Sequence, residues 1–89
     1  MKVVIDKTFE KDIKKLKDVA LNRKVAVVLE VMLEAEDLKT ITGVKKLQGS
    51  DVFYRIRIGN FRLGFVFENE TATMVRCLHR KDIYKYFPK

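Results

Sequence analysis

The sequence predicts a single α+β domain: an N-terminal strand, an αα-hairpin, an antiparallel β-sheet and a short C-terminal helix. Three observations lead to this fold class. Apolar residues recur at helical spacing in the first half of the chain, they alternate with polar residues in the second half, and a Gly-Asn pair separates two alternating runs. The length of 89 residues suits one domain, and we place it over residues 1–89.

The first half of the chain reads as a strand followed by two helices. Val3–Ile5 is a short apolar strand, Thr8 is expected to cap the first helix, and Asn22 is expected to separate the two helices. Two apolar stripes at helical spacing mark them, namely Phe9, Ile13, Leu16 and Ala20, then Val25, Val28, Leu29, Met32 and Leu33. We expect both stripes to pack into the core.

The second half begins with a connector and continues into a β-hairpin. The connector covers residues 38–51, and Val44–Leu47 within it is expected to be extended. Residues 53–67 form the hairpin, with Gly59 and Asn60 as a two-residue turn.

The turn sets the register of the hairpin. Ile58 then pairs with Phe61, and Arg57 lies opposite Arg62. Successive side chains point to opposite faces, so Arg55 shares a face with both of these arginines while the other face is apolar. Like charges directly opposite one another are destabilising, which indicates that this face binds an anion.

A further strand is expected over Ala72–Leu78, and its register is ambiguous. A two-residue turn before it would bury Arg76 as an unpaired charge, which is costly. We therefore favour the register shifted by one residue, which places Val75 and Cys77 inward and Arg76 among the arginines. That register leaves Met74 facing outward.

The chain ends in a predicted helical segment over Lys81–Phe87. Ile83, Tyr84 and Phe87 recur there at helical spacing, and Pro88 is expected to stop the helix. A tyrosine of this segment can either pack or take part in a site.

Charge is distributed unevenly along the chain. The net charge of the whole chain is +7, yet residues 1–38 contain eight basic and eight acidic side chains. Residues 39–89 contain eleven basic and four acidic side chains, so the whole excess belongs to the strand-rich half. This asymmetry is typical of a surface that binds nucleic acid.

Several classes of function are disfavoured by composition. The chain has one His and one Cys, so we expect no metal site. It has no glycine-rich phosphate loop and no other sign of a cofactor. It has no apolar run long enough for a membrane span and no disulfide framework. We therefore expect a cytoplasmic protein with no membrane partner and no small-molecule cofactor.

The basic and aromatic residues of the second half suit RNA. Guanidinium groups bind phosphate oxygens in pairs, and tyrosine rings stack on bases. An RNA strand also carries its own nucleophile, the 2′-hydroxyl, so positioning and charge stabilisation are enough to cleave it. His79 is either structural or catalytic. The expected RNA-binding residues are Lys45, Lys46, Arg76, His79, Lys81 and Tyr86.

Three segments together resemble the RelE/ParE superfamily of toxins from type II toxin–antitoxin modules. They are Leu47-Gln-Gly49, the run from Tyr54 to Leu63, and His79-Arg-Lys-Asp-Ile-Tyr84. The order of elements is similar to that family over essentially the whole chain. The resemblance implies a RelE-like fold.

The resemblance to RelE-type members also implies an activity and a set of residues. It implies a ribosome-dependent mRNA endonuclease that cuts in the ribosomal A site by 2′-hydroxyl attack without metal. It also implies a cognate antitoxin protein as a partner, besides ribosome and mRNA. The catalytic residues carried over are Arg55, Arg57, Arg62, Arg80 and Tyr84.

The sequence differs from the family pattern at two points, and two other functions remain as alternatives. Arginine stands where some RelE toxins have lysine on the first hairpin strand, and the short spacing after Arg80 leaves Tyr84 and Tyr86 both as candidates. A ParE-like inhibitor of DNA gyrase and a non-catalytic RNA- or ribosome-binding module are the alternatives.

Overall fold

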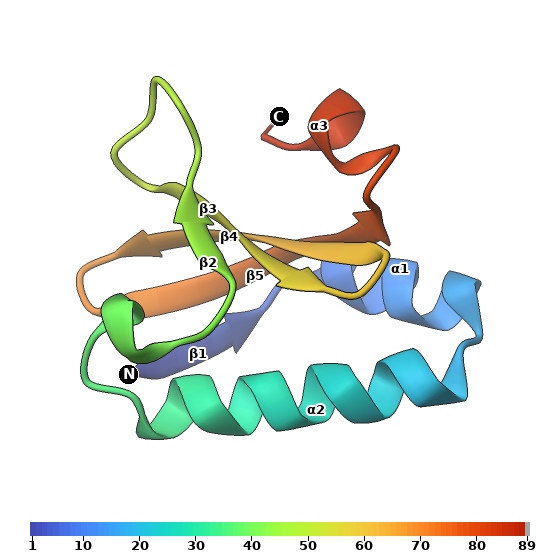
Figure 1. Cartoon of the computed structure of the whole chain (residues 1–89), viewed down its shortest axis with the longest axis horizontal. Helices are drawn as coiled ribbons and strands as arrows, with labels where there is room; N and C mark the ends of the chain where they lie inside the picture. The colour runs from blue at the N-terminus through green and yellow to red at the C-terminus, as the bar shows by residue number, and fades with distance from the viewer. Residues whose placement is uncertain (89) are drawn as a thin grey trace.

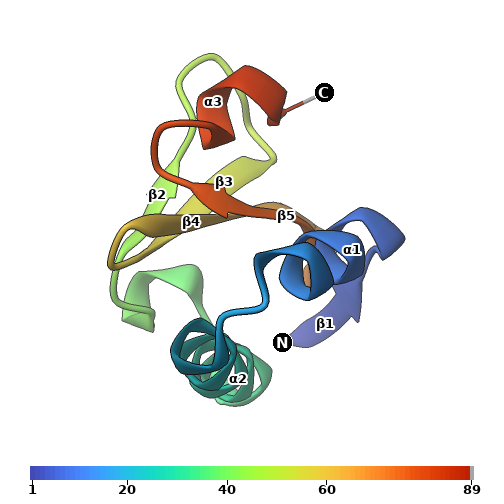
Figure 2. The same ribbon diagram turned by 90° about the vertical axis from the view of Figure 1, so that its right-hand side faces the viewer.

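The computed structural model describes residues 1–88, which form a five-stranded sheet with two helices on one face and a short helix on the other (Figures 1 and 2). The predicted α+β class is confirmed. In chain order the elements are β1 (Lys2–Ile5), α1 (Lys7–Leu16), α2 (Val19–Glu34), a 3-10 turn (Leu38–Thr40), β2 (Val44–Lys46), β3 (Phe53–Ile58), β4 (Phe61–Glu68), β5 (Thr71–His79) and α3 (Ile83–Tyr86).

The strand order in the sheet is β1-β5-β4-β3-β2. Strands β2 to β5 are antiparallel to their neighbours, whereas β1 pairs in parallel with β5, so the sheet is mixed. The two long helices carry the chain from β1 at one edge of the sheet to β2 at the other (Figure 1). Within residues 1–88, none of the helices combines the length and the apolar character that crossing a membrane requires.

Two predicted helix boundaries are wrong, and side-chain capping explains both. Helix α1 is capped by Asp6, whose carboxylate accepts the backbone N–H of Thr8 at 3.1 Å, so Thr8 lies inside the helix. The break between the helices falls at Lys17, which adopts a left-handed φ of 49°, and at Asp18, which caps α2. Asn22 lies within α2 and interrupts nothing.

The core lies between the two long helices and the apolar face of the sheet. Two members of the predicted stripes, Ala20 and Leu33, are exposed because the helices turn them away from the sheet. The buried residues between these layers are Phe9, Leu21, Val25 and Met32 of the helices, Ile41 of the connector, and Ile56, Ile58, Leu63, Phe65, Ala72, Met74 and Cys77 of the sheet.

The predicted register of the β3–β4 hairpin is confirmed. Ile58 pairs with Phe61, and Arg57 lies opposite Arg62. Gly59 begins the turn with a φ of 55°, a conformation that L side chains rarely adopt. The hairpin therefore presents one apolar and one arginine-bearing face.

The register of β5 changes part-way along the strand, so the predicted register is correct only for its second half. Met74 pairs with Phe65 and is fully buried, whereas Arg76 pairs with Gly64 and Cys77 faces the core. Val75 is the extra residue between the two pairs. This β-bulge lets both halves of the strand bury their apolar side chains, which no single register allows.

The C-terminal segment packs on the sheet face opposite the long helices. Ile83 and Phe87 are buried there, and the ring of Phe87 lies so close to Gly64 that an added Cβ would be 2.6 Å from it. Helix α3 spans only Ile83–Tyr86, which is shorter than predicted, because Phe87 is already extended. Gly64 thus provides the flat surface on which the C-terminal segment rests.

Candidate functional site

The sheet face opposite α1 and α2 carries Arg55, Arg57 and Arg62, as the pairing of β3 with β4 requires. We call it the arginine face. The guanidinium group of Arg62 donates to the carbonyl oxygens of Gly59 and Phe61 at 2.8 and 2.9 Å. These bonds hold the side chain beside the hairpin turn.

Arg55 is held from the side of the connector. Its Nη1 donates to the carbonyl oxygen of Gly43 at 2.6 Å, the same oxygen that accepts the backbone N–H of Arg57 at 3.1 Å. Within residues 1–88, the Nε of Arg55 is buried without a hydrogen-bond partner. A buried donor without a partner carries a free-energy cost.

Arg62 lies at the centre of a group of like charges. Burial lowers the pKa of the Arg62 guanidinium, and the positive charges of Arg55, Arg57 and Arg80 lower this pKa further. The neighbouring Tyr84 raises the pKa of Arg62. The structure therefore gathers all five residues that the resemblance implied, and we call the four arginines among them the arginine cluster.

The end of β5 and helix α3 bring the C-terminal members to this cluster. The backbone N–H of Arg80 donates to the carbonyl oxygen of Asn60 at 2.7 Å, which fixes Arg80 beside the hairpin turn. Tyr84 is 60% exposed and lies near Arg62, whereas the ring of Tyr86 faces the guanidinium carbon of Arg76 at 5.7 Å. Of the two candidate tyrosines, Tyr84 is the one beside the cluster.

Arg76 already has a partner within the fold. Its Nε and Nη2 donate to the carboxylate of Asp12 at 2.8 and 3.1 Å, and these bonds raise the pKa of Arg76. Asp12 also accepts the backbone N–H of Cys77 at 3.0 Å, so it joins α1 to β5. Sequence reasoning missed Asp12, although an acid one helical turn after Phe9 lies on the apolar stripe and signals a buried partner.

The other predicted RNA-binding residues fall on different sides of the sheet. Lys45 pairs with Arg55 and shares the arginine face, and Lys81 is exposed beside Arg80. His79 does not join them, because it pairs with Phe61 and its ring meets that ring edge-on at 5.6 Å. Its Nδ1 accepts the backbone N–H of Lys81 at 3.2 Å.

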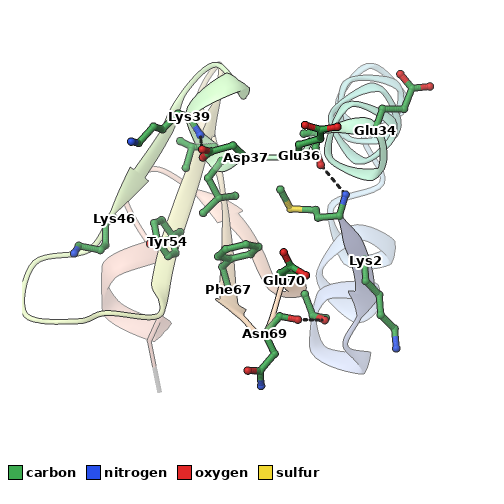
Figure 3. A pocket seen from close by; sticks show the side chains of 15 residues that line it. Lys2, Glu34, Glu36, Asp37, Lys39, Lys46, Tyr54, Phe67, Asn69 and Glu70 are labelled. Atoms are coloured by element: carbon green, nitrogen blue, oxygen red, sulfur yellow. Dashed lines mark hydrogen bonds between the residues drawn. The ribbon is translucent and has the colours of Figure 1, made fainter.

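Lys46 lies at the rim of a groove on the opposite face. It pairs with Tyr54, and both line a groove of about 1290 Å³ between the end of α2 and the strands (Figure 3). Acidic residues such as Glu34 and Glu36 also line this groove, as Figure 3 shows. It is thus electrostatically mixed and separate from the arginine cluster.

No group of three or more His, Cys, Asp or Glu side chains within the described residues is arranged to hold a metal ion. The candidate site consists of basic and aromatic side chains.

This fold and this site have known relatives. The chain is 37% identical to toxin RelE3 of Methanocaldococcus jannaschii, over 99% of this chain and 100% of that protein. The chain belongs to the RelE family of toxins. The predicted resemblance is confirmed, although no protein-family model matches the chain.

Solved structures agree with this RelE membership. The RelB–RelE antitoxin–toxin complex from Methanococcus jannaschii contains a chain that is 34% identical, with a TM-score of 0.81 over 96% of this chain and 99% of that one. The toxin–antitoxin complex RelBE2 from Mycobacterium tuberculosis contains a chain that is 24% identical, with a TM-score of 0.60 over 89% of this chain and 96% of that one. The second likeness concerns the RelE fold alone.

Proposed function

We propose that this protein is a ribosome-dependent endoribonuclease toxin that cuts mRNA in the ribosomal A site. The observation that carries the proposal is the arginine cluster with Tyr84 beside it, where burial and the positive charges of Arg55, Arg57 and Arg80 lower the pKa of Arg62. Such an arrangement is relieved by a polyanion that binds to it. Membership of the RelE family supports the choice of mRNA as that polyanion.

The chemistry that fits these residues uses the nucleophile of the RNA. The bond from the 2′-oxygen to phosphorus forms, the bond from phosphorus to the 5′-oxygen breaks, and a 2′,3′-cyclic phosphate remains. The 2′-hydroxyl loses its proton and the departing 5′-oxygen gains one. Arg62 and Arg80 stay protonated and stabilise the developing negative charge. Arg55 and Arg57 hold adjacent phosphates.

Tyr84 completes this assignment. Its ring stacks on a base or its hydroxyl passes a proton, and its exposure leaves both roles accessible. Because position, charge and proton transfer suffice for these steps, we propose that the reaction uses neither a metal nor a cofactor.

A cognate antitoxin is the second proposed partner. The solved relative from Methanococcus jannaschii is an antitoxin–toxin complex, and the arginine cluster of this chain suits an acidic or amphipathic segment of such a partner. Ribosomes and antitoxin would meet the protein in the cytoplasm, which we propose as its location.

Toeprinting on ribosomes programmed with a defined mRNA tests the activity. The purified protein should produce a new cut within the A-site codon, and the Arg62→Ala variant should not. Arg23→Ala is the matched control, because Arg23 is the one arginine in α2 and lies outside the cluster. Intact mRNA together with inhibited gyrase would support the ParE-like alternative, and ribosome binding without any cut would support a non-catalytic module.

A further inference from the structure

A second pocket lies next to the candidate site and is not used by the chemistry above. It has a volume of about 490 Å³ and opens between the β2–β3 loop and the C-terminal segment. Figures 1 and 2 both show this loop and α3 projecting from the same side of the sheet. Leu47, Phe53 and Phe87 provide apolar walls, Gln48 is exposed at the loop, and Tyr84 lines the side toward the arginine cluster. The volume is typical of a small-molecule pocket and exceeds what one nucleobase needs.

The aromatic walls are fixed by the fold. The rings of Phe53 and Phe87 meet edge-on, with centroids 5.7 Å apart. Phe87 is buried and rests on Gly64, where an added Cβ would lie 2.6 Å from its ring. Planar apolar surfaces that are held in place before binding suit the stacking of another flat ring against them.

The loop that closes the pocket is also ordered by hydrogen bonds. The backbone N–H of Leu47 donates to the carbonyl oxygen of Phe53 at 2.8 Å. The hydroxyl oxygen of Ser50 accepts the backbone N–H groups of Val52 and Phe53 at 3.1 and 3.0 Å. Gly49 has a φ of 79°, a backbone conformation that other residues rarely adopt. The loop therefore presents Gln48 from a defined backbone.

Gln48 supplies the polar edge that distinguishes a base site from a plain apolar pocket. Its amide carries both donors and an acceptor, and glutamine pairs with the edge of adenine through two hydrogen bonds. Single-stranded RNA is read in this way, with an unstacked base stacked on aromatic side chains and hydrogen-bonded at its edge.

The pocket is within reach of an RNA strand bound at the arginine cluster. Phe53 and Arg55 are two residues apart on β3, so they share the arginine face at a separation of about 7 Å along the strand. Tyr84 lies beside Arg62 of the arginine cluster and also lines the pocket. We propose that this pocket is a nucleobase subsite for single-stranded RNA, and that Gln48 makes cleavage depend on which base enters it. This inference rests on the proposed function and adds a source of codon preference.

The first test is the codon profile of cleavage on ribosomes programmed with every A-site codon. The wild-type protein should prefer one base at one codon position. Gln48→Ala should reduce that preference about tenfold, which one good contact between a side chain and a base provides. Asn22→Ala removes an exposed amide from α2 and should keep the wild-type profile. A flat wild-type profile, or a Gln48→Ala profile equal to that of wild type, would overturn the subsite.

The second test does not depend on cleavage, so it separates this inference from the proposed function. NMR spectra of the wild-type protein are recorded with a triribonucleotide and with an abasic analogue that has the same number of phosphates. We expect signals of Gly49, Phe53 and Phe87 to shift with the triribonucleotide alone, and signals of the arginine cluster to shift with both. The subsite is refuted if both ligands shift the pocket signals equally or neither does. It is also refuted if the pocket responds only to a protein such as the cognate antitoxin.

Discussion

Arg62 lies where the repulsion among like charges is concentrated, because three other guanidinium groups act on it. We predict that Arg62→Ala lowers the cleavage rate by about 10²–10³-fold, the loss typical of removing one group that stabilises a transition-state charge. The free energy of unfolding should stay within about 0.5 kcal/mol of wild type or rise slightly, since a repulsive charge is removed. Toeprinting and urea denaturation measure the two effects.

A catalytic role and a structural role of Arg62 predict opposite effects of Arg62→Ala on activity and stability. If Arg62 mainly stabilises the hairpin turn through its bonds to carbonyl oxygens, Arg62→Ala should unfold at lower urea and keep full activity per folded molecule. That result would remove Arg62 from the site. The control Arg23→Ala should match wild type in both measurements.

Cys77 illustrates the effect of burial on a single group. It is fully buried, and burial followed by the nearby charge of Asp12 raises the pKa of its thiol to about 12, above its ordinary value of 9.0. We predict no reaction with iodoacetamide at pH 8 in the native protein and rapid reaction after unfolding, since only the thiolate is the nucleophile. Rapid labelling of the native protein would contradict this burial.

The same shift in the pKa of Cys77 predicts how stability depends on pH. The thiol favours the folded state below about pH 9, and this contribution is lost as the pH rises toward 12, because the unfolded chain releases the proton first. The free energy of unfolding should fall by up to about 1.4 kcal/mol per pH unit in that window from this group. Cys77→Ala lacks the group and should show a shallower pH dependence.

At the scale of the element, the β3–β4 hairpin could be predicted from sequence and the β4–β5 pair only in part. The hairpin register follows from a two-residue turn and strict alternation, both of which are local. Strand β5 contains a bulge, and the sequence shows only that no single register places Met74 and Arg76 on opposite faces of the sheet. The Arg76–Asp12 pair joins residues 64 positions apart, so no local pattern indicates it.

Gly64 links the sheet to the C-terminal segment. A glycine within a strand signals the close approach of another group, and here that group is the ring of Phe87. We predict that Gly64→Ala destabilises the protein by about 1–3 kcal/mol, as overpacking does, and also slows cleavage because α3 carries Tyr84. Thermal denaturation and toeprinting check this.

A double-mutant cycle identifies the cause. Phe87→Ala removes the ring that the new Cβ would meet, so Gly64→Ala should cost less in that background than in wild type. Additive losses would indicate that Gly64 matters for some reason other than this contact.

Helix α3 decides which tyrosine reaches the cluster. Tyr84 lies near Arg62 and Tyr86 faces Arg76, so we predict that Tyr84→Phe slows cleavage by about 10²-fold if its hydroxyl passes a proton. Ribosome binding should be unchanged. Full activity of Tyr84→Phe combined with an inactive Tyr84→Ala would show that the ring stacks or packs. A damaging Tyr86→Phe would show that the wrong tyrosine has been assigned.

At the scale of the whole molecule, the charge asymmetry of the sequence becomes a difference between two faces. Nearly all basic residues among residues 39–88 lie on the strands or in residues 80–88, while the long helices cover the other face of the sheet (Figure 2). Composition shows the excess but not its distribution. Lys45 lies on the arginine face, whereas Lys46 and His79 lie on the opposite face of the sheet. The register of strand pairing determines on which face of the sheet each side chain lies.

This one-sided charge predicts how binding responds to salt. Neutralising a phosphate releases counterions, with a slope of about −0.7 in log affinity against log salt for each phosphate of a single strand. Four arginines that each contact a phosphate predict a slope of about −3 for a single-stranded RNA oligonucleotide. Arg57 is exposed in the cluster, so Arg57→Ala should reduce that slope by about 0.7, whereas Arg23→Ala should leave it unchanged. Fluorescence anisotropy over a range of salt concentrations measures these slopes. A wild-type affinity that does not change with salt would contradict phosphate binding at the arginine cluster, and an equal reduction in both variants would assign the response to net charge rather than to this face.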